Sequence, residues 1–345
     1  MLAIGVVGAS GVRATEESTP AKELFGRVHA PAPPMPGSIR AIGLPARGCL
    51  AGAVALPPDG PYWQAMRPSR NRRFGHPRLI ALIERLAREA RGDGWPGLLV
   101  GDLAQPRGGP MLSGHASHQT GLDADIWLSP SPERRLSEEE RETLPAPSVL
   151  REGTRTVDPE RFGPAHIALI RRAASYPEVA RIFVHPGIKQ VLCAVAGADR
   201  AWLSKIRPWW GHDSHFHLRL RCPENEPLCR DQEPPPEDDG CGAELAWWLS
   251  EEPWRPKPPT PPPPPLTLRE LPPECRSVLR APRRRERKAA SGSRPRVAHS
   301  GSSLVGARLG ELADQDEDVD DTEQEQEKPR QVQSAVLGVG GDEQS

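Results

Sequence analysis

The sequence predicts an α+β domain that is stapled by disulfide bonds. Residues 79–90 place apolar side chains at helical spacing, whereas residues 121–128 and 215–222 alternate apolar and polar side chains with the period of a strand. The chain also has an even number of cysteines, and none forms a CxxC pair. We therefore expect three disulfides in an oxidising compartment, with six buried free thiols as the alternative.

The remaining elements follow from periodicity and from helix stop residues. The predicted helix at 79–90 begins near Pro77, whose missing N–H costs little at a first helical position, and ends at Gly92. A buried strand is expected at 97–103 and another at 181–184. Further helices are expected at 165–175, 189–195 and 243–249.

Proline divides the chain of 345 residues, which has 42 prolines. Residues 1–35 hold a short signal-like segment, and the proline-rich lead-in is expected to be extended as far as residue 45. The globular domain is predicted at 36–252, and a stiff proline-rich linker at 253–280 is expected to be pinned by Cys275. The charged tail, 281–345, has the composition of a disordered segment.

The overall charge excludes some classes of partner. The net charge is −1, which provides no global field to attract nucleic acid or an acidic membrane. No segment approaches the 18 or so apolar residues of a membrane span. We expect neither a nucleic-acid partner nor a membrane span, and the sequence leaves the oligomeric state open.

Histidines gather in two short motifs, Gly-His-Ala-Ser-His and Gly-His-Asp-Ser-His-Phe-His. Neutral imidazole and carboxylate are the ligands of catalytic zinc, which keeps one position for water. His217 and Asp125 lie on the polar faces of the two predicted strands, and His118 precedes Asp125 by a length of chain that allows a turn. We therefore expect a zinc site of His118, Asp125 and His217, with His215 beside it as a base.

Two neighbouring residues have less certain roles in this pattern. His115 could line the wall of the site, act as an extra metal ligand or hydrogen-bond to a ligand, and its spacing from the other histidines does not distinguish these three roles. Asp123 shares a strand face with Asp125, and we expect it to anchor a loop or a histidine N–H.

Long motifs in the chain resemble one family. Residues 108–126, Gly-Gly-Pro-Met-Leu-Ser-Gly-His-Ala-Ser-His-Gln-Thr-Gly-Leu-Asp-Ala-Asp-Ile, closely resemble the signature of the penicillin-insensitive murein endopeptidases. Residues 207–223, with Arg-Pro-Trp-Trp before the histidines, resemble the second motif of that family. Residues 72–77, 181–184 and 240–245 are also similar, so the likeness runs from about residue 36 to 277.

This resemblance implies a fold, an activity and a compartment. The family belongs with lysostaphin-type enzymes, D-Ala-D-Ala carboxypeptidases and the hedgehog signalling domain, the LAS-type metallopeptidase group, which has a small central antiparallel sheet flanked by helices. It implies a periplasmic zinc enzyme that cuts the D-alanyl–meso-diaminopimelyl cross-link of peptidoglycan. Carried over to this chain, its zinc ligands fall on His118, Asp125 and His217, with His115 beside the metal and with His212 and His215 as the remaining site histidines. Its cysteine order suggests the pairs Cys49–Cys275, Cys193–Cys241 and Cys222–Cys229.

The motifs also suggest how the chemistry is divided. Neither histidine motif contains a glutamate, so the expected base is His215, and His212 is expected to stabilise the oxyanion or protonate the leaving amine. The implied substrate carries carboxylates, and arginine grips carboxylate in bidentate fashion. A basic rim is therefore expected from Arg72, Arg73, Arg219 and Arg221. The alternative for each of them is an ordinary surface charge without a role in binding.

Two other functions fit the same residues. A D-Ala-D-Ala carboxypeptidase would use the same ligands and differ in its products. A zinc-containing module that binds cell-wall peptide without cutting it would not need a base, whereas His215 is present.

Overall fold

The computed structural model describes residues 18–256, 258 and 261–282 of the chain. The signal-like segment at the N-terminus and almost all of the charged tail lie outside these residues, as do three positions of the proline-rich linker. The helices are α2 (Ala21–Gly26), α3 (Pro77–Ala90), α4 (Glu138–Thr143), α5 (Pro164–Ser175), α6 (Pro186–Val195), α7 (Ala243–Leu249) and α8 (Pro273–Arg280). The strands are β1 (Ala41–Leu44), β2 (Arg47–Leu50), β3 (Val54–Ala55), β4 (Trp63–Ala65), β5 (Phe74–Gly75), β6 (Leu98–Val100), β7 (Asp123–Trp127), β8 (Val179–Val184), β9 (Ile206–Pro208) and β10 (His215–Leu220).

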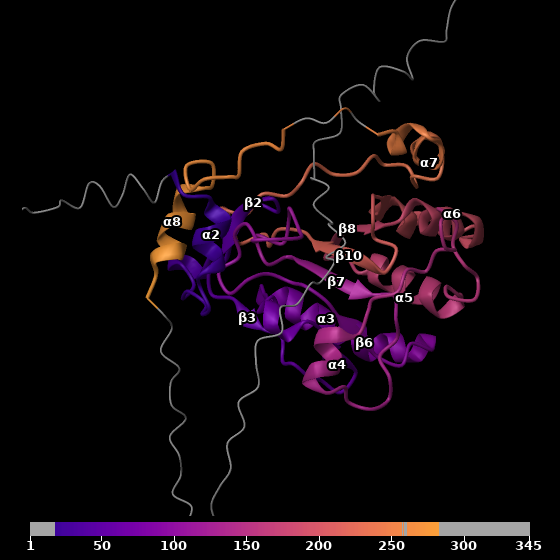
Figure 1. Cartoon of the computed structure of the whole chain (residues 1–345), viewed down its shortest axis with the longest axis horizontal. Coiled ribbons are helices and arrows are strands. Elements are labelled where there is room, and N and C mark those ends of the chain that lie inside the picture. The colour runs from indigo at the N-terminus through magenta and orange to yellow at the C-terminus, as the bar shows by residue number, and fades with distance from the viewer. Residues whose placement is uncertain (1–17, 257, 259–260, 283–345) are drawn as a thin grey trace, which may run out of the picture.

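Six strands form the central sheet in the order β4-β6-β7-β10-β8-β9. The inner strands β6, β7, β10 and β8 are labelled in Figure 1. The inner pairings, β6 with β7, β7 with β10 and β10 with β8, are antiparallel. The outer pairings, β4 with β6 and β8 with β9, are parallel. The predicted α+β class and central antiparallel sheet are confirmed, with a parallel strand added at each edge.

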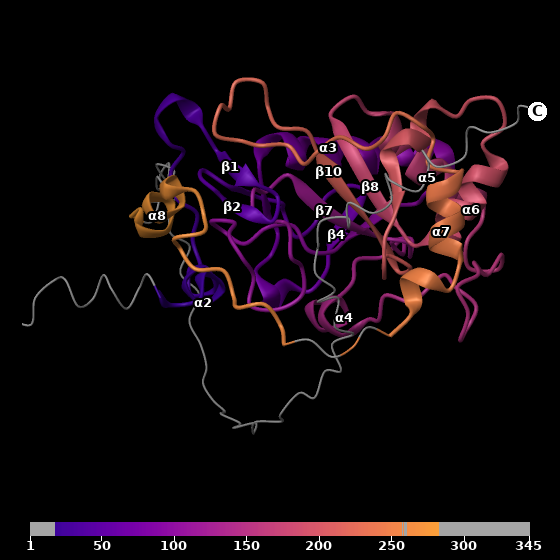
Figure 2. The same cartoon turned by 90° about the horizontal axis from the view of Figure 1, so that it is seen from above.

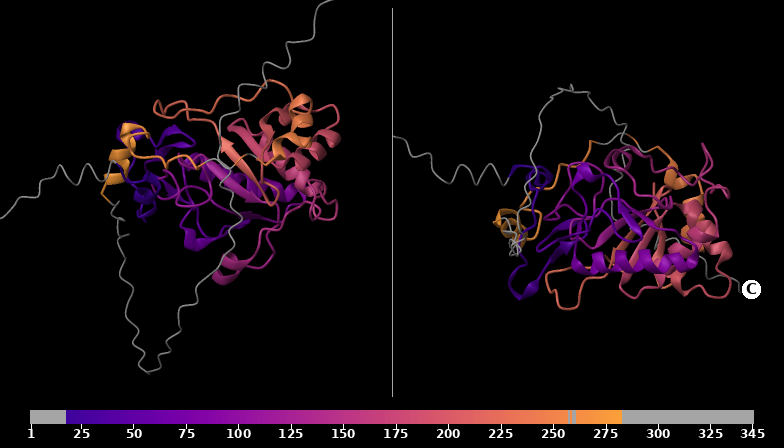
Figure 3. Two further views of the ribbon diagram at one scale, coloured as in Figure 1. Left: turned by 45° about the horizontal axis from the view of Figure 1, so that its top comes forward. Right: turned by 90° about the horizontal axis from the view of Figure 1, so that it is seen from below.

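One face of the sheet carries the main hydrophobic core. Leu122, Ala124 and Ile126 next to and within β7 pack in one cluster with Phe216 and Leu218 of β10 and with the apolar faces of α3 and α5. Helix α3 lies along this side of the sheet (Figures 2 and 3). It starts where His76 accepts a hydrogen bond from the backbone N–H of Arg78 and Pro77 takes the first helical position. The alternation in β7 and β10 therefore sends their polar side chains to the opposite face.

The first and last described helices form a second, smaller cluster at one end of the molecule. Phe25 of α2 and Val278 of α8 are buried there with Ile42 of β1. Figure 1 shows α2 and α8 at the same end of the molecule. The prediction of a fully extended lead-in is wrong for residues 21–26, because Phe25 has an apolar pocket to fill and the segment folds as a helix around it. The strands β1 and β2 in the same region were not predicted, and neither was α8.

All three predicted disulfides are confirmed, as Cys49–Cys275, Cys193–Cys241 and Cys222–Cys229. The first joins α8 to β2 and so pins the end of the linker to the domain, as expected. Among the described residues, no helix is long and apolar enough to cross a membrane.

Candidate metal centre

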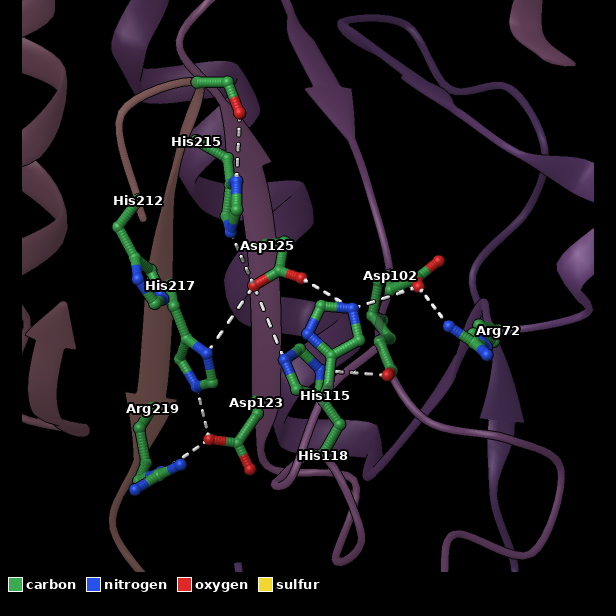
Figure 4. A network of polar contacts seen from close by, with 12 residues as sticks. Arg72, Asp102, His115, His118, Asp123, Asp125, His212, His215, His217 and Arg219 are labelled. Atoms are coloured by element: carbon green, nitrogen blue, oxygen red, sulfur yellow. Dashed lines mark hydrogen bonds and ion pairs between the residues drawn. The ribbon is translucent and has the colours of Figure 1, made fainter. Parts of the chain in front are cut away.

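The two central strands bring Asp125 and His217 face to face. The antiparallel register of β7 and β10 places His217 opposite Asp125, and Arg219 opposite Asp123. All four side chains are at most 5% exposed, although they lie on the face opposite the main core. The polar face predicted from the alternation is therefore a buried polar site, and it is the candidate functional site of the chain (Figure 4).

His118 reaches the same carboxylate from a loop. Its backbone has a φ of 65°, a left-handed conformation that is uncommon for residues other than glycine and that clusters at functional sites. Its Nδ1 lies 2.9 Å from the carbonyl oxygen of Leu103 and must carry the proton to donate there. The other ring nitrogen, Nε2, is thereby left as a lone-pair donor, and it points at Asp125.

Three histidine nitrogens converge on one oxygen of Asp125 (Figure 4). The distances to Oδ1 are 3.4 Å from His118 Nε2, 3.6 Å from His217 Nδ1 and 3.8 Å from His215 Nε2. These separations are long for hydrogen bonds, but tetrahedral ligands at about 2.0–2.1 Å from zinc lie about 3.3 Å apart. His118 Nε2 and Asp125 Oδ1 are also buried without a hydrogen-bond partner, a costly state that a shared cation removes. The donor set therefore fits a divalent metal ion.

His217 is oriented by a chain of buried polar groups behind it. Its Nε2 lies 2.8 Å from Asp123 Oδ1, and Arg219 Nε donates to the same oxygen at 2.5 Å. Burial lowers the pKa of His217 to about 4, so the ring is neutral at neutral pH. The carboxylate on Nε2 fixes the tautomer that leaves Nδ1 as a lone-pair donor, an arrangement typical of metal-binding histidines. The expectation that Asp123 anchors a histidine N–H is confirmed.

His115 faces the second oxygen of Asp125. Its Nε2 lies 3.4 Å from Asp125 Oδ2 and 3.1 Å from Asp102 Oδ2, and Arg72 Nη1 donates to the same Asp102 oxygen at 2.8 Å. Burial opposes the charge on His115, but Asp125 and Asp102 together raise the pKa of its ring to about 9. Donor atoms of His115, His118 and Asp125 lie within 4.8 Å of one another, so these three residues form a compact trio that could hold a metal ion and that leaves out His217. The His115 nitrogen that faces Asp125 also has Asp102 as a partner, whereas the His217 nitrogen that faces Asp125 is Nδ1, on the side of the ring away from Asp123.

Two further histidines line the site beside the converging atoms. His215 is 13% exposed at its side chain, and its Nδ1 lies 3.3 Å from Ser214 Oγ. The His212 ring centroid lies 5.0 Å from that of His215, and its Nδ1 donates to the carbonyl oxygen of Trp210 at 2.7 Å. Burial, together with the neighbouring His215 and His217, holds the pKa of His212 well below its usual value. With Nδ1 carrying the proton, neutral His212 presents a bare Nε2.

The four arginines predicted for a basic rim have different positions. Arg72 lies in the site wall through Asp102, and Arg219 is buried behind His217. Arg73 donates to the carbonyl oxygen of Leu56, and among the described residues no hydrogen bond or ion pair joins it to the site histidines. Arg221 is exposed at the end of β10.

The prediction from sequence missed Asp102 and Phe183. Asp102 follows the strand β6, and a carboxylate inside the predicted apolar strand at 97–103 was the available indication. The ring of Phe183 lies 5.3 Å from that of His217, and its apolar character gave no indication of this position.

Comparison with known proteins agrees with these motifs. Residues 41–280 match the family model described as penicillin-insensitive murein endopeptidase. Curated proteins of that name are 46% identical: one from Haemophilus influenzae over 75% of this chain and 89% of its own length, and one from Klebsiella pneumoniae over 71% and 88%. One from Escherichia coli is also 46% identical, over 71% of this chain and 88% of its own length.

Proposed function

The chain belongs to the penicillin-insensitive murein endopeptidase family, and from this premise we propose that it is a zinc-dependent peptidoglycan hydrolase. The proposed reaction is hydrolysis of D-alanyl–meso-diaminopimelyl cross-links. The observation that carries the proposal is the convergence of three histidine nitrogens on Asp125 Oδ1. Asp125 Oδ1 and His118 Nε2 are buried and have no hydrogen-bond partner.

His118, Asp125 and His217 would hold the ion, and His115 is the candidate for a fourth protein ligand. Two imidazoles and one carboxylate are a ligand set of catalytic zinc in peptidases. Zinc bound there would lower the pKa of a coordinated water and polarise the scissile carbonyl. The Leu103 carbonyl and the Asp123 carboxylate support this assignment, because each fixes the tautomer that a ligand histidine requires.

His215 and His212 would handle the protons. His215 Nε2 faces the metal-binding carboxylate from the more exposed side, where it can take a proton from a water at the site. His212 must first receive a proton at its bare Nε2 before it can donate one to the leaving amine or to a developing oxyanion. No serine is acylated in this scheme, so penicillin would have nothing to trap.

The proposed location is the periplasm, where the cross-linked wall lies. Three disulfides support this compartment, because they form and persist in oxidising environments.

The test is incubation of the purified chain with cross-linked muropeptide dimers, with product masses as the measurement. We expect conversion of dimers to monomers that penicillin does not inhibit, that a chelator abolishes and that added Zn²⁺ restores. The variant His215→Ala should retain zinc and lose about 10²–10⁴-fold in rate, as expected for a general base.

Other products would assign a different function. Release of terminal alanine alone would indicate a carboxypeptidase, and bound zinc without any product would indicate a wall-binding module. Either result would contradict the proposed endopeptidase.

A further inference from the structure

A pocket of about 470 Å³ lies next to the metal centre. Its lining includes Arg181 of β8, Arg219 and Arg221 at the end of β10, and Lys205, and the segment 231–237 completes its wall. The register pairs Arg219 with Arg181 and His217 with Phe183. Side chains paired in this way share one sheet face, so the pocket begins one two-residue step, about 7 Å, along the strand from His217.

Arg219 is the wall shared by the metal centre and the pocket. On one side its Nε holds Asp123, which in turn holds His217. On the other side its Nη1 donates to Gln232 Oε1 at 2.6 Å, within the segment that lines the pocket. The Phe183 ring, 5.3 Å from both the His217 ring and the Arg219 guanidinium carbon, fills the space between them. The pocket thus adjoins the candidate active site along the same sheet face, with Arg219 and Phe183 between the two.

Positive charge gathers at the Arg221 end of the pocket. The guanidinium of Arg221 is exposed and has no hydrogen-bond or ion-pair partner within the described part of the chain. Lys205 Nζ donates to the carbonyl oxygen of Tyr176, and burial together with nearby Arg221 lowers the pKa of Lys205. Two cations that repel each other in this way favour an anion between them.

Within the described part of the chain, none of the acidic residues that line the pocket forms an ion pair with Arg221 or Lys205. Asp231 accepts the backbone N–H of Cys222, which occupies one of its oxygens. Glu233 and Glu237 are exposed, so water solvates their carboxylates.

We infer that this pocket binds a free carboxylate of the wall peptide on one side of the scissile bond, with Arg221 as the principal contact. The inference rests on the proposed function, since it assigns a subsite to the same substrate. A wall peptide in extended conformation advances about 3.3–3.6 Å per residue, so a carboxylate within two or three residues of the bond reaches the pocket. Arginine suits this role because its planar fork can hold both carboxylate oxygens.

The experiment compares Arg221→Ala with the wild-type chain on muropeptide dimers whose peptide carboxyls are either free or amidated. With the free acid, KM should rise about three- to tenfold and kcat should stay unchanged, because an exposed charge-assisted contact is lost. With the amidated dimer, the two proteins should have the same KM. The KM of Arg221→Lys on the free acid should lie between those of wild type and Arg221→Ala, since lysine keeps the charge but lacks the planar guanidinium. Arg88→Ala, an exposed arginine on α3 at the opposite side of the sheet, is the matched control and should behave as wild type.

An unchanged KM for Arg221→Ala on the free acid would overturn the inference while leaving the endopeptidase intact. If the wild-type chain does not cleave dimers, the proposed function fails, and calorimetric binding of the monomeric muropeptide still tests the pocket. Weaker binding by Arg221→Ala alone would then support it, and equal binding by both proteins would refute it.

Discussion

At the scale of single residues, three of the five site histidines have an anchor for one ring nitrogen. Leu103 anchors His118, Asp123 anchors His217 and Trp210 anchors His212, and in each case the second nitrogen is left with its lone pair. In the proposed metal site, these anchors would orient the donor atoms before an ion binds, because a fixed tautomer and ring orientation need no rearrangement on binding.

The period-two alternation was enough to predict that His217 and Asp125 share a site, since both lie on regular strands. The position of His118 could be predicted only as a turn of suitable length, because its left-handed backbone follows from tertiary contacts. The Arg72–Asp102–His115 contacts could not be predicted at all, because they join three separate segments.

Asp123→Asn should weaken metal binding, because the neutral amide holds His217 less firmly in the required tautomer. We expect a loss of about 10- to 100-fold in zinc affinity, measured by competition with a chromogenic chelator. Stability should also fall by about 3 kcal/mol, because Arg219 loses its buried counter-charge.

Asp199→Asn is the control for the loss of a carboxylate, since Asp199 pairs with Arg171 at the exposed surface. This substitution should change neither the zinc affinity nor the free energy of unfolding measurably. Wild-type zinc affinity in Asp123→Asn would show that the Asp123 carboxylate does not orient His217.

At the scale of elements, sequence periodicity predicted the long segments well and the short ones poorly. Helix α3 begins at the proline and carries the apolar stripe that the spacing predicts. Strands β4 and β9 have three residues each, too few for alternation to be recognised, and they exist because the edges of the sheet offer partners. Helix α2 was missed because its stability comes from burial of Phe25 against distant residues rather than from its own sequence.

The N-terminus of α6 should make stability depend on pH. His185 Nδ1 accepts the backbone N–H of Gly187, and only a neutral ring can do so. Burial lowers the pKa of His185 to about 4, from 6.5 in the unfolded chain. The unfolded state therefore binds more protons between these values, and the contribution of this cap is complete above pH 6.5 and is lost as the pH falls towards 4.

The variant His185→Asn keeps a capping oxygen that does not titrate. Chemical unfolding at several pH values measures the free energy of unfolding of both proteins. Between pH 6.5 and 4 this free energy should fall by about 3 kcal/mol more for wild type than for the variant. Parallel pH profiles for the two proteins would show that His185 is not the titrating group.

At the scale of the whole molecule, a covalent link holds the ends of the domain together. The Cys49–Cys275 bond has a sequence separation of 226, and it fixes α8 where Arg107 donates to the carbonyl oxygens of Val278 and Leu279. Arg107 lies in the segment between β6 and β7 that also carries His115 and His118, so the far end of the chain supports the segment that builds the site.

Replacing both Cys49 and Cys275 with Ala should cost about 5 kcal/mol of unfolding free energy, because closing so long a loop restricts the unfolded chain strongly. The same double replacement at Cys222 and Cys229, with a separation of 7, should cost about 2 kcal/mol. Denaturant titrations of the two variants measure the difference. Equal losses would show that loop length does not determine the contribution of the long link.

The described contacts also predict which part of the chain catalysis requires. The site residues and their anchors run from Arg72 to Arg219, the last cysteine is Cys275, and the family match ends at residue 280. A chain that stops after residue 282 keeps every one of these groups and the Arg107 contacts with α8. Its kcat and KM on soluble muropeptide dimers should therefore lie within about twofold of the full chain, because every described contact of the site is retained. A large fall in kcat for a truncated chain that melts at the wild-type temperature would mean that the charged tail takes part in the reaction itself.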